Sequence, residues 1–150
     1  MTTITHQSPA QLQQMAQRVL DMPMAKTLGL TFTRVAAGDI EVEIPILDAF
    51  SFRPGQLQAT PVFAIADFAA VAAAGSLLPA GWFNATVDAT LKLVAPAKGA
   101  LLRARGRVVH TGKLLTTCAA DVFAVSDTGE ETLCATLLGT ARNIPGEAPH

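Results

Sequence analysis

The stretch from Pro61 to Gly75, PVFAIADFAAVAAAG, places the strongest constraint on the fold. As a helix it would be apolar on every side apart from Asp67, and it follows Thr60-Pro61, a predicted N-cap and first helical residue. Its 15 residues fall short of the ~20 needed to cross a bilayer, and a charge lies in its middle. The stretch therefore predicts a buried helix, ending near Gly75 to Pro79, that other parts of the chain surround.

The segment before this helix predicts one helix and two strands. Ser8-Pro9-Ala10-Gln11 has the pattern of a capping box, so a helix is expected over about residues 8–22, with a further turn over 24–28. Residues 30–36 and 39–46 are expected to form strands. The second of these alternates apolar with acidic residues, which is typical of a strand with one face in water.

Four β-like runs follow the apolar helix, near residues 83–94, 99–110, 113–125 and 131–142. Short breaks rich in glycine, proline and aspartate separate them, so consecutive strands are expected to pair antiparallel. A helix that is apolar on all sides is accounted for if this sheet curls around it. We therefore expect an α+β fold in which an antiparallel sheet of about six strands wraps a central apolar helix.

Composition limits the class of protein. The chain has 150 residues, half of them apolar, so we expect a single domain over residues 1–150, with a flexible tail after about residue 143. Charged residues make up 15% and the net charge is -1, so neither nucleic acid nor a membrane is expected as a partner. No basic cluster followed by an apolar run opens the chain, and a cytoplasmic location is therefore expected.

Two cysteines are too few for a disulfide scaffold. Pairing of the last two strands about Thr128 would place residue 122 opposite Cys134. Cys118 would then lie four residues along the strand, roughly 13 Å away, which is too far for a disulfide. Both cysteines are expected to be free thiols in the core.

Several segments in order resemble the hotdog-fold acyl-CoA thioesterases of the phenylacetate-pathway type. They are the apolar helix with its single acid, Leu93-Val94-Ala95-Pro96-Ala97, and the run from Arg107 to Lys113, RVVHTGK. The segment from Met22 to Ile46 is similar to that family's entry into the first strand pair. The resemblance spans about residues 20–144. It implies a sheet wrapped around the central helix, protomers joined edge to edge, and active sites at the interface of a dimer at least.

The resemblance assigns roles to residues around the helix start. The family's helix usually opens with a His-Gly-Gly triplet nine residues before the catalytic acid, and here Gln58, Ala59 and Thr60 occupy those places. An Asn or Gln that helps to bind substrate or water often precedes the triplet by six residues, where this chain has Phe52. One turn after the acid, Val71 stands in place of a common hydroxyl.

The chemistry of thioester hydrolysis is compatible with these departures. A thiolate leaves readily because its conjugate acid has a pKa near ~8.5, so a general acid is not needed. Asp67 is expected to act as general base or as nucleophile, with a pKa raised by burial. Backbone amides near Ala59 and Thr60 would form the oxyanion hole, although Pro61 removes one donor. In the resembled family the acid and this amide belong to opposite protomers.

Each of these residues also has a structural interpretation. Asp67 is either a catalytic acid or a buried carboxylate satisfied by hydrogen bonds. Gln58 is either a substrate contact or an ordinary loop residue. Four aromatic residues near the helix start either pack in the core or line an acyl channel: Phe50, Phe52, Phe63 and Phe68.

Arg103, Arg105 and Arg107 alternate along one strand, which places them on one face of the sheet. Together with Lys113 they form either a solvated outer face or a binding site for the phosphates of coenzyme A. Three histidines and two cysteines show no ligand spacing, so no metal is expected.

The expected function is hydrolysis of an acyl-CoA thioester, with no cofactor besides the coenzyme A of the substrate. The alternative is a non-catalytic hotdog protein that binds an acyl-CoA or another acyl ligand, which the missing His-Gly-Gly triplet favours. A hotdog dehydratase or hydratase is disfavoured, because such enzymes generally pair a histidine with the acid and Gln58 occupies that place.

Overall fold

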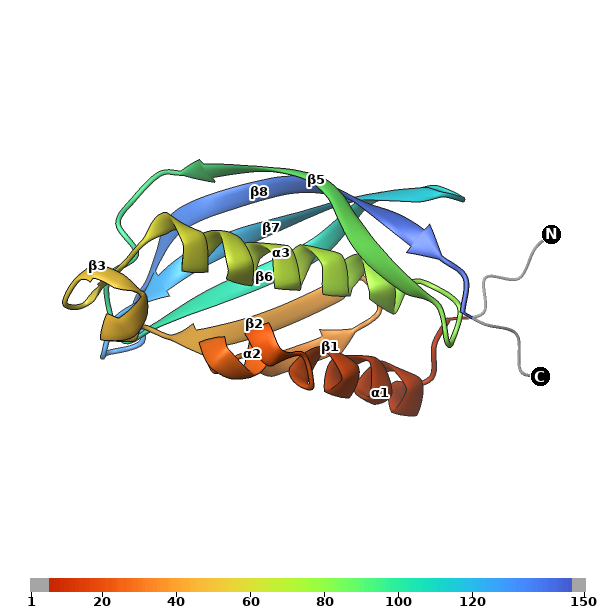
Figure 1. Cartoon of the computed structure of the whole chain (residues 1–150), viewed down its shortest axis with the longest axis horizontal. Coiled ribbons are helices and arrows are strands. Elements are labelled where there is room, and N and C mark those ends of the chain that lie inside the picture. The colour runs from red at the N-terminus through yellow and green to blue at the C-terminus, as the bar shows by residue number, and fades with distance from the viewer. Residues whose placement is uncertain (1–5, 147–150) are drawn as a thin grey trace.

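The computed structural model describes residues 6–146 as one long helix held within a curved sheet (Figure 1). Helices and strands follow one another in nearly the order expected from the sequence. The elements are α1 (Pro9–Leu20), α2 (Pro23–Leu28), β1 (Thr31–Ala36), β2 (Asp39–Pro45), the 3₁₀ turn η1 (Asp48–Phe50), β3 (Ser51–Arg53), β4 (Gln56–Leu57), α3 (Ala59–Ser76), β5 (Phe83–Leu93), β6 (Leu101–Thr111), β7 (Leu115–Val125) and β8 (Glu131–Ile144).

Six strands form one antiparallel sheet in the order β1-β2-β6-β7-β8-β5. The prediction of a six-stranded antiparallel sheet around a central helix is confirmed. The strand that directly follows α3, β5, crosses to the far side of the sheet and becomes one of its two edges. The segment between β2 and α3, expected to be a loop, contains the short β3–β4 hairpin.

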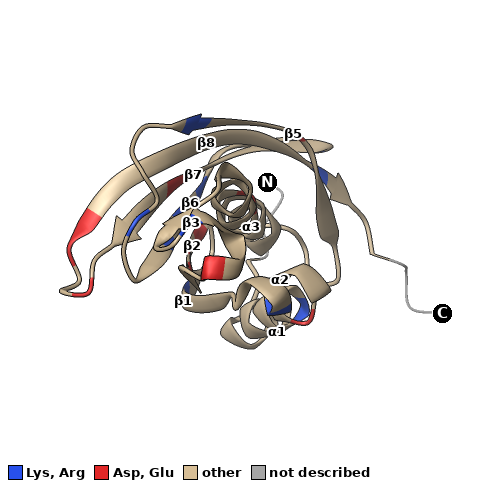
Figure 2. Ribbon diagram, turned by 60° about the vertical axis from the view of Figure 1, so that its left-hand side comes forward, with Lys and Arg blue, Asp and Glu red and all other residues tan. Residues whose placement is uncertain are grey.

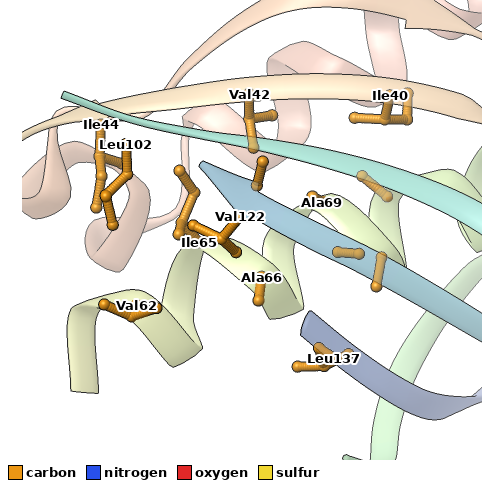
Figure 3. Packing of buried hydrophobic residues seen from close by; sticks show 14 of the residues in the cluster. Ile40, Val42, Ile44, Val62, Ile65, Ala66, Ala69, Leu102, Val122 and Leu137 are labelled. Atoms are coloured by element: carbon orange, nitrogen blue, oxygen red, sulfur yellow. The ribbon is translucent and has the colours of Figure 1, made fainter. Parts of the chain in front are cut away.

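The core consists of small side chains on α3 packed against larger ones from the sheet. In Figure 3, side chains from β2, β6, β7 and β8 gather around Ile65, Ala66 and Ala69 of α3. The closest approach is at Gly106 of β6, where an added Cβ atom would overlap the carbonyl group of Ala69. The alanine-rich composition of α3 therefore allows the strands to come close to its backbone. By length and composition α3 would be apolar enough to cross a membrane, but here it is the core helix of the sheet.

The first helix begins as the capping box predicts. Ser8 accepts a hydrogen bond from the Gln11 amide, and the Gln11 side chain accepts one from the Ser8 amide. Just before α1, the buried side chain of Gln7 donates to the carbonyl oxygens of Gly75 and Leu78 at 3.1 and 2.8 Å. This link ties the start of α1 to the end of α3, so the two helices run side by side in opposite directions (Figure 1).

Two boundaries differ from the expected ones. The helix α3 begins at Ala59 with Gln58 as its N-cap, so the prediction of Thr60 as the cap is wrong. Pro61 is tolerated there because the first turn of a helix does not use its own amides. At the other end of the chain, β8 continues through Ile144, and Asn143 is buried and donates to the carbonyl of Gly112 at 2.9 Å. The remainder of the expected tail lies partly outside the described residues, at 147–150.

Cys118 and Cys134 are both free and buried, as predicted. The expected pairing of residue 122 with Cys134 is wrong by one position. The register shifts between Val122 and Phe123, so Val122 faces Ala135 and Cys118 faces Gly139. The bulge supplies the extra residue that the simple count about the turn omits.

Candidate active site

Asp67 lies in the middle of α3 and is partly buried. The Thr86 hydroxyl donates a hydrogen bond to Asp67 Oδ1 at 2.8 Å. Burial raises the pKa of the Asp67 carboxyl above its ordinary value of 3.8, and the bond from Thr86 partly opposes this rise. Within the described residues, Asp67 forms no salt bridge. Its carboxylate is therefore oriented by a neutral donor and remains without a compensating cation.

Sequence reasoning missed Thr86, which reaches Asp67 from the edge strand β5. Two residues earlier, Asn84 donates to the backbone carbonyl of Val71 at 2.9 Å. Residues 84 and 86 share one face of a strand, and residues 67 and 71 share one face of a helix, so the two bonds dock β5 onto α3. The register shifts directly after Thr86, which is typical of a β-bulge. Two polar residues spaced by two, in an edge strand expected to face an apolar helix, were the signal available in the sequence.

An apolar groove of about 270 Å³ opens next to Asp67, between α1 and β5, with α3 as its floor. Asp67 and Thr86 supply polar groups at one place in its wall, and most other lining residues are apolar. The groove is lined by Met15, Arg18 and Val19 of α1 and Met22 just after it, by Asp67, Phe68, Val71, Ala72 and Gly75 of α3, and by Trp82 just before β5 and Phe83, Asn84, Ala85 and Thr86 of β5.

The proposed oxyanion donors lie at the start of the same helix, about two turns before Asp67. Gln58, Ala59 and Thr60 are exposed, and the Gln58 amide is already bonded to the carbonyl of Phe50 at 3.0 Å. Eight residues separate Ala59 from Asp67, a rise of about 12 Å along the helix axis at ~1.5 Å per residue. One chain therefore does not bring the acid and the helix-start amides together.

The aromatic residues do not form one cluster. Phe68 lines the groove beside Asp67, whereas Phe50 lines a separate hollow of about 280 Å³ at the start of α3, together with Gln58 and Thr60. Phe52 is 55% exposed, with the Arg53 guanidinium 5.2 Å from the centre of its ring. Phe63 is also exposed. Of Phe50, Phe52, Phe63 and Phe68, it is Phe68 that lies beside the acid within the described chain.

Arg103 and Arg105 alternate with the buried, helix-facing residues of β6, so they lie on the outer face of the sheet, where they are engaged in ion pairs. Figure 2 marks the basic positions of the ribbon in blue and the acidic ones in red. Arg103 contacts Glu43 and Glu131 at 2.7 Å each, and Arg105 contacts Glu41 at 2.8 Å and Glu131 at 2.6 Å. The helix-facing residues of the same strand alternate with them and are buried.

Arg107 and Lys113 are exposed. None of the four basic residues lines the groove at Asp67, and their contact with coenzyme A stays a prediction. Within residues 6–146, no three His, Cys, Asp or Glu side chains come together as a metal site.

Comparison with known proteins agrees with this architecture. A family model described as the thioesterase superfamily matches residues 62–131. A search of curated protein sequences gives no match.

Among solved structures, a thioesterase family protein from Silicibacter pomeroyi is similar at 29% identity and a TM-score of 0.85, over 90% of this chain and 99% of that one. A phenylacetic acid degradation-related protein from Ralstonia eutropha is similar at 27% identity and a TM-score of 0.73, over 87% and 98%. The E. coli PaaI protein from the phenylacetic acid degradation operon shares the fold at 20% identity and a TM-score of 0.78, over 91% and 96%. The hotdog fold and the resemblance expected from the sequence are confirmed.

Proposed function

Given that this chain is a hotdog-fold protein whose sequence matches the thioesterase superfamily, we propose that it hydrolyses an acyl-CoA thioester with Asp67 as the catalytic carboxylate. One observation carries the proposal: Asp67 is a partly buried carboxylate that forms no salt bridge within the described residues and is held by Thr86 at a largely apolar groove. Such a carboxylate is costly to bury, and groups of this kind concentrate at functional sites.

Two routes are open to the carboxylate. As a general base, Asp67 would take a proton from a water molecule that attacks the thioester carbonyl, and coenzyme A would leave as the thiolate. As a nucleophile, it would form a mixed anhydride with the acyl group and release the same thiolate, after which water would cleave the anhydride. Both routes end with a carboxylic acid and free coenzyme A, need no cofactor, and suit the expected cytoplasmic location.

The proposed site is completed by a second copy of the chain. Within residues 6–146, the outer edge of β5 has no strand beside it, so β5 of a second copy would extend the sheet across the interface. Phe83, Val87 and Leu93 of this strand are exposed apolar residues that such pairing would cover. Helix-start amides of that copy would then serve as donors for the oxyanion near Asp67. We expect light scattering to show at least a dimer at micromolar concentration, and a monomer would contradict the shared site.

The experiment is a thiol-release assay over straight-chain and aryl acyl-CoAs, with Asp67→Asn and Asp67→Ala beside the wild type. Both variants are expected to lose at least about a hundredfold in kcat. The matched control is Asp121→Asn, because Asp121 also accepts a hydrogen bond from a threonine, Thr136, at 2.8 Å, but on β7 away from the groove. The proposal fails if the wild type releases no thiol, or if both Asp67 variants keep full activity.

The alternative function is binding of an acyl-CoA without turnover. It is favoured by the absence of the His-Gly-Gly triplet, since Gln58, Ala59 and Thr60 occupy its place. This alternative predicts that acyl-CoAs bind to the wild type and to Asp67→Asn with similar affinity and release no thiol from either.

A further inference from the structure

The helix α1 forms one complete wall of the groove beside Asp67. Its lining residues Arg18 and Val19 follow Met15 by three and four positions, so the three share one face of the helix, and Met22 lines the groove just beyond the helix end. Met15 is buried at 7% exposure, whereas Met22 is 47% exposed. The α1 wall is therefore closed at Met15 and open toward the end of the helix.

The polar reacting groups lie at one place in the groove, and its floor extends from there along α3. The reacting groups, Asp67 and Thr86, lie on α3 and β5, and the floor continues along α3 through Val71 and Ala72 to Gly75. From residue 67 to residue 75 the helix rises about 12 Å, at ~1.5 Å per residue. Near Gly75 the Gln7 side chain ties the start of α1 to α3, which fixes the position of this wall.

We infer that this groove holds the acyl chain of the substrate and that α1 sets the chain length accepted, an inference that rests on the proposed function of Asp67. The floor of the groove from Asp67 to Gly75 is about 12 Å long, and an extended chain with carbon–carbon bonds of ~1.5 Å needs about eight to ten carbons to span it. The occupant is therefore an apolar acyl group of medium length, about eight carbons. A short acyl group would leave part of the apolar lining exposed to water, and a much longer one would extend past Met15.

Two pairs of variants test the role of α1. Met15→Ala removes three heavy atoms from the wall, and Leu12→Ala is its control because Leu12 is equally buried on α1, at 8% exposure, without lining the groove. Val19→Phe fills the groove, and Val35→Phe is its control because Val35 is also partly buried but lies on β1 outside the groove. The controls share the loss or gain of side-chain volume but leave the groove unchanged.

The probes are S-alkyl-coenzyme A thioethers of increasing chain length, which cannot be hydrolysed, titrated into the wild-type protein and each variant by calorimetry. Affinity is expected to rise about three- to fourfold per methylene up to about eight carbons and then to level off. Met15→Ala should move this limit to longer chains by about two to three carbons, and Val19→Phe should move it to shorter ones. Leu12→Ala and Val35→Phe should leave it where it is.

The outcomes separate this inference from the proposed function. Length-dependent binding that shifts as expected, in a protein that releases no thiol from acyl-CoAs, supports the groove assignment and overturns the proposed hydrolysis. Thiol release that needs Asp67, with thioether binding independent of chain length or shifted equally by Leu12→Ala and Met15→Ala, overturns the groove assignment alone. No thioether binding together with no thiol release overturns both.

Discussion

Carboxylates on the two sides of the sheet have pKa values shifted in opposite directions. On the outer face, hydrogen bonds from Arg105 and Arg103 lower the pKa of Glu131 to about 2. On the inner side, burial raises the pKa of Asp67, and among the described residues its side-chain donor is the neutral hydroxyl of Thr86. The outer acid is thus matched to the charges around it, and the inner acid is not.

This difference indicates which carboxylate is kept for stability and which for chemistry. A paired surface carboxylate contributes modestly to the free energy of folding. A partly desolvated carboxylate without a salt bridge destabilises the folded state, so its presence calls for another reason. The raised pKa that makes Asp67 unfavourable for stability is the same property that makes its carboxylate more basic.

The inner face is also the more sensitive to added volume, which Gly106→Ala tests. The new Cβ atom would overlap the carbonyl of Ala69, so the helix must move away from β6. We expect a loss of about 3 kcal/mol in the free energy of unfolding, measured by urea denaturation. Gly75→Ala is the matched control, since its Cβ atom would meet only the Asn84 side chain at 3.5 Å. Equal stability of the two variants would contradict the close packing of α3 against β6.

Thr86→Val removes the hydroxyl that donates to the inner acid. Because the lost bond favours the ionised carboxylate, the pKa of Asp67 should rise further and the acid limb of the kcat/KM profile should move to higher pH. We expect kcat/KM to fall by about tenfold near pH 7. Thr86→Ser should restore most of it, and Thr136→Val, which removes the equivalent bond to Asp121 on the outer face, should leave the profile unchanged. A profile that does not move in Thr86→Val would show that this bond has no role in orienting the acid.

The fold was largely predictable because hydrophobic patterning determines it. A run such as Pro61 to Gly75, apolar on all sides, requires enclosure, and short breaks between the later strands require antiparallel pairing. The two predictions that are wrong concern local features. The early start of α3 at Ala59 and the one-residue shift at Val122 each depend on tertiary contacts that override a local sequence rule.

The site was predictable only where a single residue departs from its surroundings. Asp67 is conspicuous as the one charge in an apolar helix. Thr86 is not, because one threonine in a strand has many possible neighbours until the register of β5 is known. The same applies to Glu131, whose contacts with Arg103 and Arg105 span the intervening strand β7.

Asp67→Asn tests the difference between the inner and outer carboxylates by its effect on the free energy of unfolding instead of on activity. A folded-state pKa above the unfolded value means that the ionised acid disfavours folding, so the stability from this group is lost as pH rises through the folded pKa. The amide carries no such charge and keeps an oxygen for the Thr86 hydroxyl. We expect the variant to be about 1 kcal/mol more stable than the wild type near pH 7, with the difference vanishing below the ordinary pKa of the acid. A variant less stable than the wild type near pH 7 would mean that the inner acid is structural.

Glu131→Gln, on the outer face, is expected to change the free energy of unfolding in the opposite direction. The pKa of Glu131 is lowered from 4.5 to about 2, so its contribution to stability is present above 4.5 and is lost as pH falls toward 2. The variant should be less stable by about 0.5 kcal/mol near pH 7, because the pairs are largely at the surface, and should approach the wild type in acid. Added salt should reduce this difference, whereas it should leave the gain from Asp67→Asn nearly unchanged because that carboxylate forms no salt bridge within the described residues. Differences of the same sign in the two variants would show that the two faces do not differ in what their carboxylates do.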